Sequence, residues 1–545
     1  MNKGTSMTAG EGIRDIVLRN AQVVDGTGNP WFYADVGIRG ERIVFVRKRT
    51  SEHRTYEAAI EIDCKGLVVC PGFIDIHNHS DLAIFSNPNA YNYIFQGVTT
   101  IVVGNCGTSA APLAKNEDGG EFHDFVSHKE IAQTDGKSFT QYLMALKNLQ
   151  KAINVAALVG HGQIRNCVLG LEKRPASNDE IINMKACAAE AMEAGAFGLS
   201  TGLIYSPGMY ATTQEIVELA KVVSKYDGLY VSHLRSEADT ILHALMECVE
   251  IAEASGCRAQ VSHLKASGRR NWGMVDVALR TMEYARRTGV EITFDAYPFA
   301  PSGASIFVLF PDWARSGGKA SLQEKIQDPN TREQIKKELE RPSTEWENIY
   351  LDAGPEELFI TSSIKYPEYV GKTLADISTL RSEKPLNLLF TLAEEDINMS
   401  MIAGGMSEDD NNTVLAHRLG MIASDSRVVK FGEAMPHPRT YCAFTKVLSR
   451  SVKEQSLLPL EVAIYKMTGF PAWKLGLHDR GVIKSGAKAD LVVLDLWKTS
   501  CESQFADPHH YAEGVEHLMV NGQFVIREQQ PTNAMPGQVL SRTNR

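Results

Sequence analysis

The strongest constraint on the fold is a regular alternation of short apolar strands and amphipathic helices between residues 73 and 425. The strands that this pattern predicts occupy residues 73–77, 98–104, 155–160, 196–201, 229–233, 259–263, 292–297 and 420–425. Such an alternation is typical of a parallel sheet with helical crossovers, and eight strands can close a (β/α)8 barrel. We therefore predict an α/β protein built on a TIM barrel, with its functional groups at the carboxyl ends of the strands.

Both ends of the chain have a different pattern, because short strands and turns replace the alternation there. Asn521-Gly522, near the C-terminus, is a signal for a type I′ hairpin turn. We expect residues 1–70 and 475–545 to form one small composite β-sandwich domain, and residues 71–474 to form the barrel.

One segment interrupts the alternation of strands and helices between the seventh and eighth predicted strands. Residues 311–395 contain charged, helix-like segments where a short connection is expected. Because connections of this length are uncommon unless they are functional, we expect an inserted lid or small subdomain that covers the substrate.

Composition excludes several kinds of partner. The 545 residues are 43% hydrophobic and carry a formal net charge of −10, which argues against nucleic acid or an anionic membrane as the main partner. No apolar run reaches the length of a membrane span, and the N-terminal residues lack the apolar segment of a secretory signal. Nine cysteines without paired spacing suggest free thiols in a reducing compartment. We expect a cytoplasmic enzyme with a small-molecule substrate; the sequence leaves its oligomeric state open.

Several of the predicted strands end in residues that bind metals. Residues two apart on a strand point to the same side, so two histidines that follow the first strand can reach one point. The candidates are His77 and His79 after the first strand, Cys106 after the second, His233 after the fifth, His263 after the sixth and Asp425 after the eighth. Imidazole nitrogen and thiolate sulfur together are a donor set that zinc accepts.

Each of these residues has a simpler interpretation when taken alone. Cys106 could be a small buried hydrophobe, His233 and His263 could be hydrogen-bonded core histidines, and Asp425 could cap the next helix. The metal site is favoured because one architectural rule brings all of these residues to the same end of the barrel.

A set of motifs distributed over the whole chain points to one family. They are Val98-Thr-Thr-Ile-Val-Val-Gly-Asn-Cys-Gly107, Gly160-His161-Gly162, Ser232-His-Leu-Arg-Ser-Glu237, Ser262-His-Leu-Lys265, Asp295-Ala-Tyr-Pro298, Ser424-Asp425, His437-Pro-Arg439 and Ala489-Asp490-Leu. With these motifs the chain resembles the N-acyl-D-amino-acid deacylases (D-aminoacylases) of the amidohydrolase superfamily. The resemblance implies a (β/α)8 barrel with a β-sandwich made from both termini, and a zinc hydrolase.

The resemblance also implies roles for the strand-end residues. Cys106, His233 and His263 match the ligands of a tightly bound zinc, His77 and His79 match a second, weaker position, and Asp425 matches the catalytic carboxylate. Relatives with a binuclear hydantoinase-like site use a carboxylated lysine at the end of the fourth strand. Residues 196–202 contain no lysine, so Cys106 would take the bridging role and a hydantoinase-like site is disfavoured.

The chemistry expected of this set is hydrolysis of a linear amide. Asp425 would take a proton from the attacking water and return it to the leaving amine. The substrate's α-carboxylate must also be held, and Lys265, Arg439 and Tyr205 are the candidates that the resemblance supports. His161 could position the acyl group, or it could have only a structural role; an exposed lysine or arginine could equally be no more than a solvated charge.

Substrate preference is less constrained by the sequence. The segment 298–310 is apolar and aromatic, which favours an uncharged D-residue, while Ser426 and Cys442 stand where the family commonly has glycine and suggest a specialised acylated residue or small peptide. Two other hypotheses remain: a different amidohydrolase activity on cyclic imides, ureides or dipeptides, and a catalytically silent scaffold. The scaffold is disfavoured because the chain retains every metal-ligand candidate and Asp425.

Overall fold

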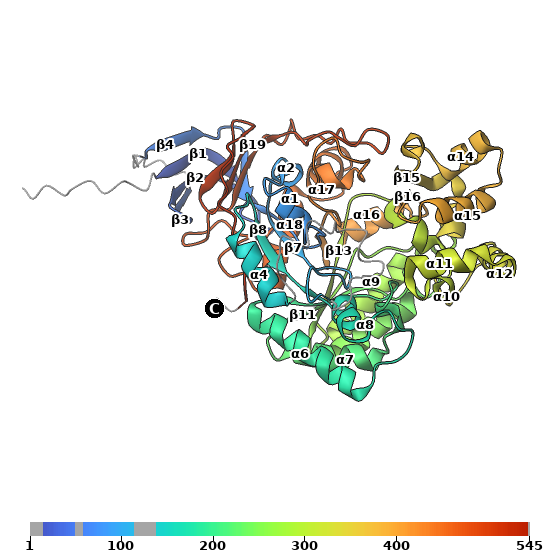
Figure 1. Ribbon diagram of the computed structural model, residues 1–545. Helices are drawn as coiled ribbons and strands as arrows, with labels where there is room; N and C mark the ends of the chain where they lie inside the picture. The colour runs from blue at the N-terminus through green and yellow to red at the C-terminus, as the bar shows by residue number, and fades with distance from the viewer. Residues whose placement is uncertain (1–14, 49–57, 114–137, 543–545) are drawn as a thin grey trace, which may run out of the picture.

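The computed structural model describes residues 15–48, 58–113 and 138–542. Figure 1 shows a barrel at the centre, a sheet with strands from the N-terminal and C-terminal regions on one side and an inserted unit on the other. Residues 1–14 and 49–57 of the predicted composite domain lie outside the described residues.

The barrel consists of eight parallel strand positions that follow one another in chain order. They are β6 (Phe73–Asp75), β7 (Val98–Val103), β8 (Asn154–Ala157) continued by β9 (Val159–Gly160), β10 (Gly198–Gly202), β11 (Leu229–His233), β12 (Arg258–Val261), β13 (Ile292–Ala296) and β17 (Gly420–Ile422). Strands β6 to β8 form one hydrogen-bonded sheet, and β9 to β13 together with β17 form another. The ring closes where the N–H of Asp425 donates to the carbonyl of His77 at 3.0 Å and the N–H of His79 donates to the carbonyl of Ser426 at 2.8 Å. The predicted barrel is confirmed.

Helices surround the barrel and bury their apolar faces against it. They are α4 (Phe139–Asn148), α5 (His161–Leu169), α6 (Asn178–Ala194), α7 (Thr213–Ser224), α8 (Ile241–Ser255), α9 (Met274–Arg287), α16 (Glu408–Ala416), α17 (Arg439–Lys446), the π-helix η7 (Val447–Glu454), α18 (Leu460–Met467) and α19 (Gly469–Leu475). Local chemistry sets their starts: Ser138 and Ser177 both form capping boxes, which satisfy amide groups that the first helical turn leaves free.

A nine-stranded sheet is assembled from both ends of the chain. Its strands are β1 (Ile16–Val23), β2 (Phe32–Arg39), β3 (Arg42–Lys48), β4 (Ile60–Asp63), β5 (Val68–Pro71), β18 (Leu491–Leu494), β19 (Val515–Val520), β20 (Gln523–Arg527) and β21 (Gln530–Pro531). Strand β5 is central, because it pairs with β1 on one side and with β18 on the other. It leads directly into β6, so the terminal sheet holds the first barrel strand in place.

The segment between β13 and β17 forms a unit with its own core. Its antiparallel sheet contains β14 (Ser302–Ser305), β15 (Leu358–Ser362) and β16 (Ser400–Ala403), and its helices are α10 (Asp312–Arg315), α11 (Gly318–Gln327), α12 (Pro329–Leu339), α13 (Ile349–Ala353), α14 (Leu374–Arg381) and α15 (Pro385–Glu395). A hydrophobic cluster that includes Leu322, Leu358 and Phe390 is separate from the barrel core. Figure 1 shows this unit beside the barrel. We propose that the division expected from the sequence, with an insertion at 311–395, describes independent structural domains.

One disulfide corrects an expectation from the sequence. Cys442 in α17 is bonded to Cys501, which lies in the connection between β18 and β19, and the other seven cysteines are free thiols. The expectation of nine free thiols is therefore wrong for this pair. The two cysteines are 59 residues apart, and they meet because the connection after β18 packs on α17, with the Phe505 ring 5.1 Å from that of His437.

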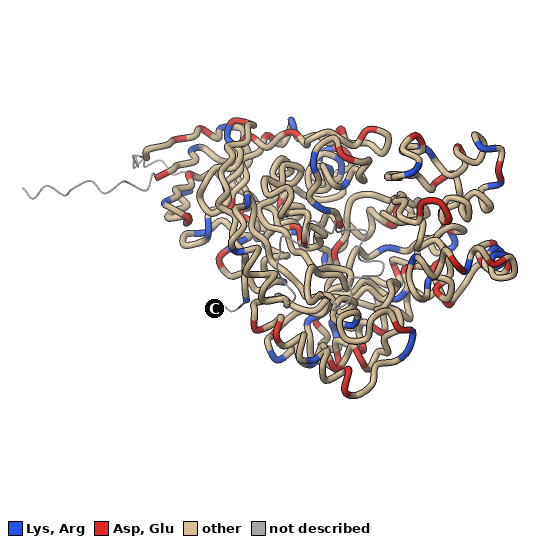
Figure 2. The backbone as a smooth tube through the Cα atoms, viewed as in Figure 1, with Lys and Arg blue, Asp and Glu red and all other residues tan. Residues whose placement is uncertain are grey.

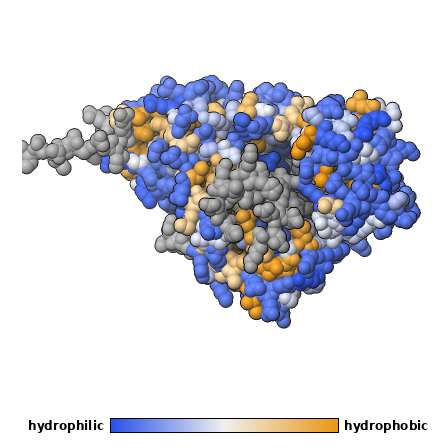
Figure 3. All heavy atoms as spheres, in the orientation of Figure 1, coloured by the Kyte–Doolittle hydropathy of each residue, from blue (hydrophilic) through white to orange (hydrophobic). Residues whose placement is uncertain are grey.

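The surface carries charges of both signs. In Figure 2, basic and acidic residues are interspersed along the outer helices and loops, and on the face in Figure 3 the visible hydrophobic residues form separate patches within a largely hydrophilic surface. None of the helices in the described residues is long and apolar enough to cross a membrane.

A buried ion pair joins the terminal sheet to the barrel, and we expect its loss to destabilise the fold. The Asp490 carboxylate pairs with Arg480, accepts the Asn521 main-chain N–H at 2.6 Å and accepts the Asn154 side-chain amide of β8 at 3.2 Å. Asp490→Ala would leave Arg480 buried without its counter-charge, which costs about 3–5 kcal/mol. Urea denaturation should show a lower free energy of unfolding.

The matched control is Asp507→Ala, because Asp507 pairs with His510 at the surface and its side chain is 72% exposed. We expect this change to alter the free energy of unfolding by less than about 0.5 kcal/mol. Equal effects of the two substitutions would contradict a structural role for the buried pair.

Candidate metal centre

Three side chains from different barrel strands converge on one buried point. The Cys106 sulfur lies 3.3 Å from Nε2 of His77 and 3.4 Å from Nε2 of His263. Cys106 follows β7, His77 follows β6 and His263 follows β12, and all three residues are buried. Burial disfavours the charged thiolate, but positive charge on His77 and His263 holds the pKa of the Cys106 thiol well below its usual value. A thiolate held between imidazoles is a coordination site for a soft or borderline cation.

The remaining predicted ligands adjoin this point. The ring centre of His233 lies 4.4 Å from that of His263, and the ring centre of His79 lies 5.2 Å from that of His77. Both ring nitrogens of His233 are buried and make no hydrogen bond with any described residue. Nε2 of His233 lies 3.7 Å from a Glu237 carboxylate oxygen. Because buried polar atoms are normally satisfied, a ligand role for one of the two nitrogens would fit these surroundings, and that role stays a prediction. The donor set of imidazole and thiolate fits zinc.

Two carboxylates orient the histidines from behind. Asp295, at the end of β13, lies 3.0 Å from Nδ1 of His77 and also accepts the main-chain N–H of His263 at 2.9 Å. Glu237 lies 2.9 Å from Nδ1 of His263. Contacts of this kind hold the ring and leave Nε2 free to bind a metal. The sequence analysis quoted both residues within motifs but assigned them no role; a carboxylate at a strand end was the available signal for Asp295.

Asp425 sits between the histidines and a buried arginine. Its Oδ1 lies 3.2 Å from Nε2 of His79 and 3.4 Å from Nε2 of His77, while Oδ2 lies 2.9 Å from an Arg439 nitrogen. Burial opposes the charged form, but Arg439 and His77 hold the pKa of Asp425 well below its ordinary value. The carboxylate is therefore ionised and able to accept a proton beside the metal-ligand cluster.

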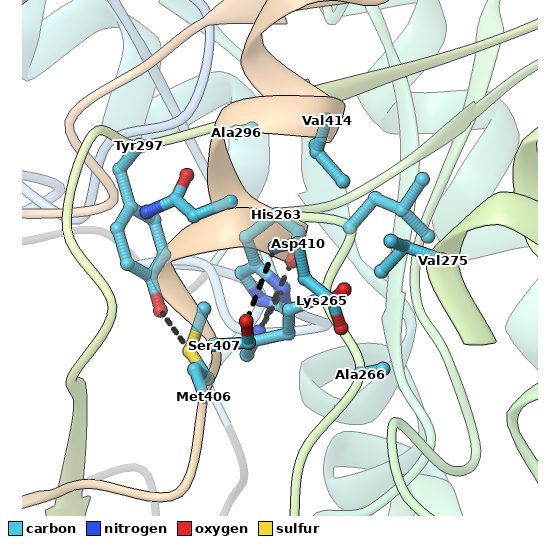
Figure 4. Close-up of a pocket in the computed structure, with 12 residues that line it drawn as sticks. His263, Lys265, Ala266, Val275, Ala296, Tyr297, Met406, Ser407, Asp410 and Val414 are labelled. Carbon is cyan, nitrogen blue, oxygen red and sulfur yellow. Dashed lines mark hydrogen bonds between the residues drawn. The ribbon is translucent and has the colours of Figure 1, made fainter. Parts of the chain in front are cut away.

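Two cations and a phenol line the open side of the centre. Lys265 donates to Glu237 at 2.7 Å, and the Arg439 guanidinium lies 4.4 Å from the centre of the Tyr297 ring. Tyr297 was missed in the sequence analysis, although it follows Asp295 in a quoted motif. Figure 4 shows Lys265 and Tyr297 on the wall of a pocket, with Met406 beside the Tyr297 hydroxyl.

The two other predicted substrate-binding residues lie in different surroundings. Tyr205 has its ring centre 5.0 Å from that of His233, so it adjoins the centre. His161 instead lies 3.0 Å from Glu215, which also binds Arg165, in a buried ion-pair network. This contact supports the structural alternative for His161, and the substrate-binding roles of both residues remain predictions.

Three residues of the centre have an unusual backbone conformation. Cys106, His263 and Asp425 have φ values of 52°, 34° and 47°. Left-handed conformations are disfavoured for residues other than glycine and persist where the surroundings impose them, often at functional sites. In each case the chain turns at the end of a barrel strand, which directs the side chain toward the shared point.

The inserted unit contacts the back of the centre through one glutamate. The side chain of Glu347, just before α13, accepts the main-chain N–H of Glu237. Removal from water and the nearby Glu237 carboxylate raise the pKa of Glu347 to about 8. Arg270 adds a second link, because it contacts Asp239 of the barrel at 2.6 Å and Asp352 of the inserted unit at 3.0 Å.

Proteins of known activity resemble this chain over nearly its full length. The profile of the Amidohydrolase family matches residues 61–302 and 410–526. Among curated proteins, the chain is 34% identical to an N-acyl-D-glutamate deacylase and 32% identical to a D-aminoacylase, both from Alcaligenes xylosoxydans xylosoxydans; each match covers 97% of this chain, with 96% and 98% of the respective relative. A crystal structure of N-acyl-D-glutamate deacylase from Bordetella bronchiseptica, complexed with zinc and a phosphonate inhibitor, superposes with a TM-score of 0.82 at 31% identity, covering 97% of this chain and 99% of that one.

The barrel, the strand-end cluster and the profile match define the protein as an amidohydrolase. Within that class, the full-length similarity places the chain in the N-acyl-D-amino-acid deacylase family. The family resemblance expected from the sequence is confirmed.

Replacing the thiolate is expected to weaken metal binding. Cys106→Ser exchanges a soft, readily ionised donor for a hydroxyl, so we expect at least about tenfold weaker zinc affinity. Chelator competition measures the affinity, and elemental analysis measures the bound zinc. Cys187→Ser is the control, since Cys187 lies on helix α6 and its pKa is raised to about 11. Equal zinc affinity in the two variants would exclude Cys106 as a ligand.

Glu347 is expected to make stability depend on pH. Its pKa rises from 4.5 to about 8 on folding, so the native state binds the additional proton. The stability that this proton provides is complete below about pH 4.5 and is lost as the pH rises through about 8. Glu347→Gln mimics the protonated side chain. The difference between the thermal midpoints of this variant and of the wild-type protein should therefore shift in favour of the variant as the pH rises from 5 to 8. The exposed neighbour Glu345→Gln should show no such trend, and identical pH profiles for both variants would refute this role.

Proposed function

We propose that this protein is a zinc-dependent hydrolase that cleaves the amide bond of N-acyl-D-amino acids. The observation that carries the proposal is the buried convergence of Cys106, His77 and His263 with Asp425 beside them. Family membership supports the same reaction class, because the relatives named above are deacylases of N-acylated D-residues.

The side chains present fit a zinc ion. Cys106, His233 and His263 would hold the principal ion, and His77 and His79 would provide a second, weaker position. Zinc bound there supplies Lewis-acid polarisation of the substrate amide. Asp295 and Glu237 keep His77 and His263 in the ring orientation that binding requires.

Asp425 acts as the general base and then as the general acid. Its carboxylate takes a proton from the attacking water and delivers that proton to the leaving nitrogen, so one group serves both steps. Arg439 and the histidines keep the carboxylate ionised before substrate binds. The products are a carboxylate from the acyl group and a free D-amino acid.

The substrate's α-carboxylate is held by the cations on the open side of the centre. Lys265 and Arg439 are both buried and lie 5.9 and 4.4 Å from the centre of the Tyr297 ring. Arg439 can bind a carboxylate through two parallel hydrogen bonds. Holding this group orients the scissile amide toward Asp425, and Tyr205 contributes a phenol on the side of His233.

The adjoining cavity favours an uncharged side chain on the D-residue. Its wall includes Val275, Val414 and Met406 together with the carboxylate of Asp410, and Lys265 is the single lysine or arginine among its lining residues. Figure 4 shows the two valines and Met406 on this wall. Because Lys265 is assigned to the α-carboxylate, the wall offers no further lysine or arginine for an acidic side chain. We propose D-methionine or D-leucine derivatives as better substrates than those of D-glutamate.

The test is hydrolysis of matched N-acetyl-D- and N-acetyl-L-amino acids by zinc-loaded protein, measured by release of the amine. We expect turnover of the D-series, with methionine and leucine ahead of glutamate. Asp425→Asn should lower kcat by about 10²- to 10⁴-fold, because the amide cannot accept the proton.

Asp507→Asn is the control, since it makes the same chemical change at the surface. Equal turnover of both enantiomers would refute the stereochemical part of the proposal. Absence of turnover in both series, with zinc bound, would direct the search to cyclic amides or peptides.

A further inference from the structure

Lys446 has fewer polar partners than three buried lysines of the barrel, Lys151, Lys466 and Lys474. Lys151 and Lys466 each donate two hydrogen bonds to main-chain carbonyls, and Lys474 donates to a carbonyl and to Glu291. Lys446 donates to no described residue; its ammonium lies 3.5 Å from the centre of the Phe299 ring. Burial lowers the pKa of Lys446 to about 8, with Arg450 adding to the effect. A cation removed from water normally has an anionic or hydrogen-bonding partner.

Lys446 lines a second pocket, which opens to solvent. The polar part of its wall comprises Lys446, Arg450, Glu408, Asn411, Asn412, Ser451 and Gln455, so it carries two basic groups and one carboxylate. The side-chain amides of the two asparagines and of Gln455 make no hydrogen bond with any described residue, so they are free to donate. The wall belongs to α16, to the segment after β13, to the end of α17, and to the π-helix η7 with the residue that follows it.

Helix α16 separates this cavity from the substrate cavity. Ser407, Asp410, Asn411 and Val414 line the substrate side, whereas Glu408, Asn411, Asn412 and Leu415 line the other side. Both sets have the spacing of one helical face. The second cavity is therefore distinct from the proposed catalytic centre, although the two share a wall.

The charges around the cavity leave one positive charge without a counter-ion. Arg450 pairs with Glu408, which lies on the same wall. No carboxylate of a described residue lies within ion-pair distance of Lys446. Contact with the Phe299 ring offsets part of the desolvation cost of the ammonium. The unmatched cation and three free amide donors are the complement of a small oxyanion.

We propose that this second cavity binds a small oxyanion, a carboxylate or a phosphate, with Lys446 as its charged partner and Asn411, Asn412 and Gln455 as hydrogen-bond donors. The bound anion would also adjoin Phe299, whose ring packs 5.2 Å from that of His437. His437 in turn accepts the main-chain N–H of Arg439 at 3.1 Å. The site thus lies behind the cation proposed to hold the substrate carboxylate.

The experiment is calorimetric titration of the full-length zinc-loaded protein with inorganic phosphate and, separately, with acetate, at constant ionic strength. We expect saturable binding of at least one of them, and the comparison identifies the preferred oxyanion. Lys446→Gln should weaken that binding at least tenfold, while Lys446→Arg should retain it. Arg450→Gln tests the cavity independently and should weaken binding to a smaller degree.

Two further variants separate this cavity from other cationic positions. Lys430→Gln removes a surface charge that pairs with Glu433, and Lys265→Gln removes a cation of the substrate cavity; binding at Lys446 should survive both. Loss of binding in Lys265→Gln with retention in Lys446→Gln would place the anion in the substrate cavity and overturn the proposal. Absence of saturable binding of both anions to the wild-type protein would also overturn it.

Discussion

The candidate centre depends on the hydrogen bonds that close the barrel between its first and eighth strands. The main chains of His77 and Asp425 are joined directly, and those of His79 and Ser426 are joined beside them. Below this ladder, Asp75 accepts hydrogen bonds from both the main chain and the hydroxyl of Ser424. Because these contacts are buried, they fix the distance between the two histidines and the carboxylate that would act on the substrate. The other candidate ligands are positioned relative to these two joined strands.

The geometry of the site comes from turns in the backbone as much as from side chains. Cys106, His263 and Asp425 all adopt left-handed conformations where their strands end. Such conformations cost free energy, and they persist here because the packed barrel imposes them, whereas isolated peptides would avoid them. Asp295 links two of the strands involved, because it contacts His77 and the main chain of His263. A site with this construction has little freedom to adjust to another metal geometry.

The barrel and the strand-end residues could be predicted because each is encoded locally. An apolar run predicts a buried strand, and the barrel rule places whatever follows it at one end, which is how His233 and His263 could be brought together from sequence alone. Glu237, Tyr297 and Glu347 could not be assigned roles, since their contacts depend on loop paths and on how the inserted unit docks. The Cys442–Cys501 disulfide was missed for a similar reason, as the packing of a connection from the terminal sheet brings the two cysteines together.

The composite sheet has a consequence for how the protein is made. Strand β5, which leads into the first ligand-bearing strand, is flanked by β1 from the start of the chain and by β18 from near its end. During synthesis, β1 is available to β5 at once, whereas β18 is made only after all the strands of the barrel. The strand that precedes His77 thus gains its second flanking support late.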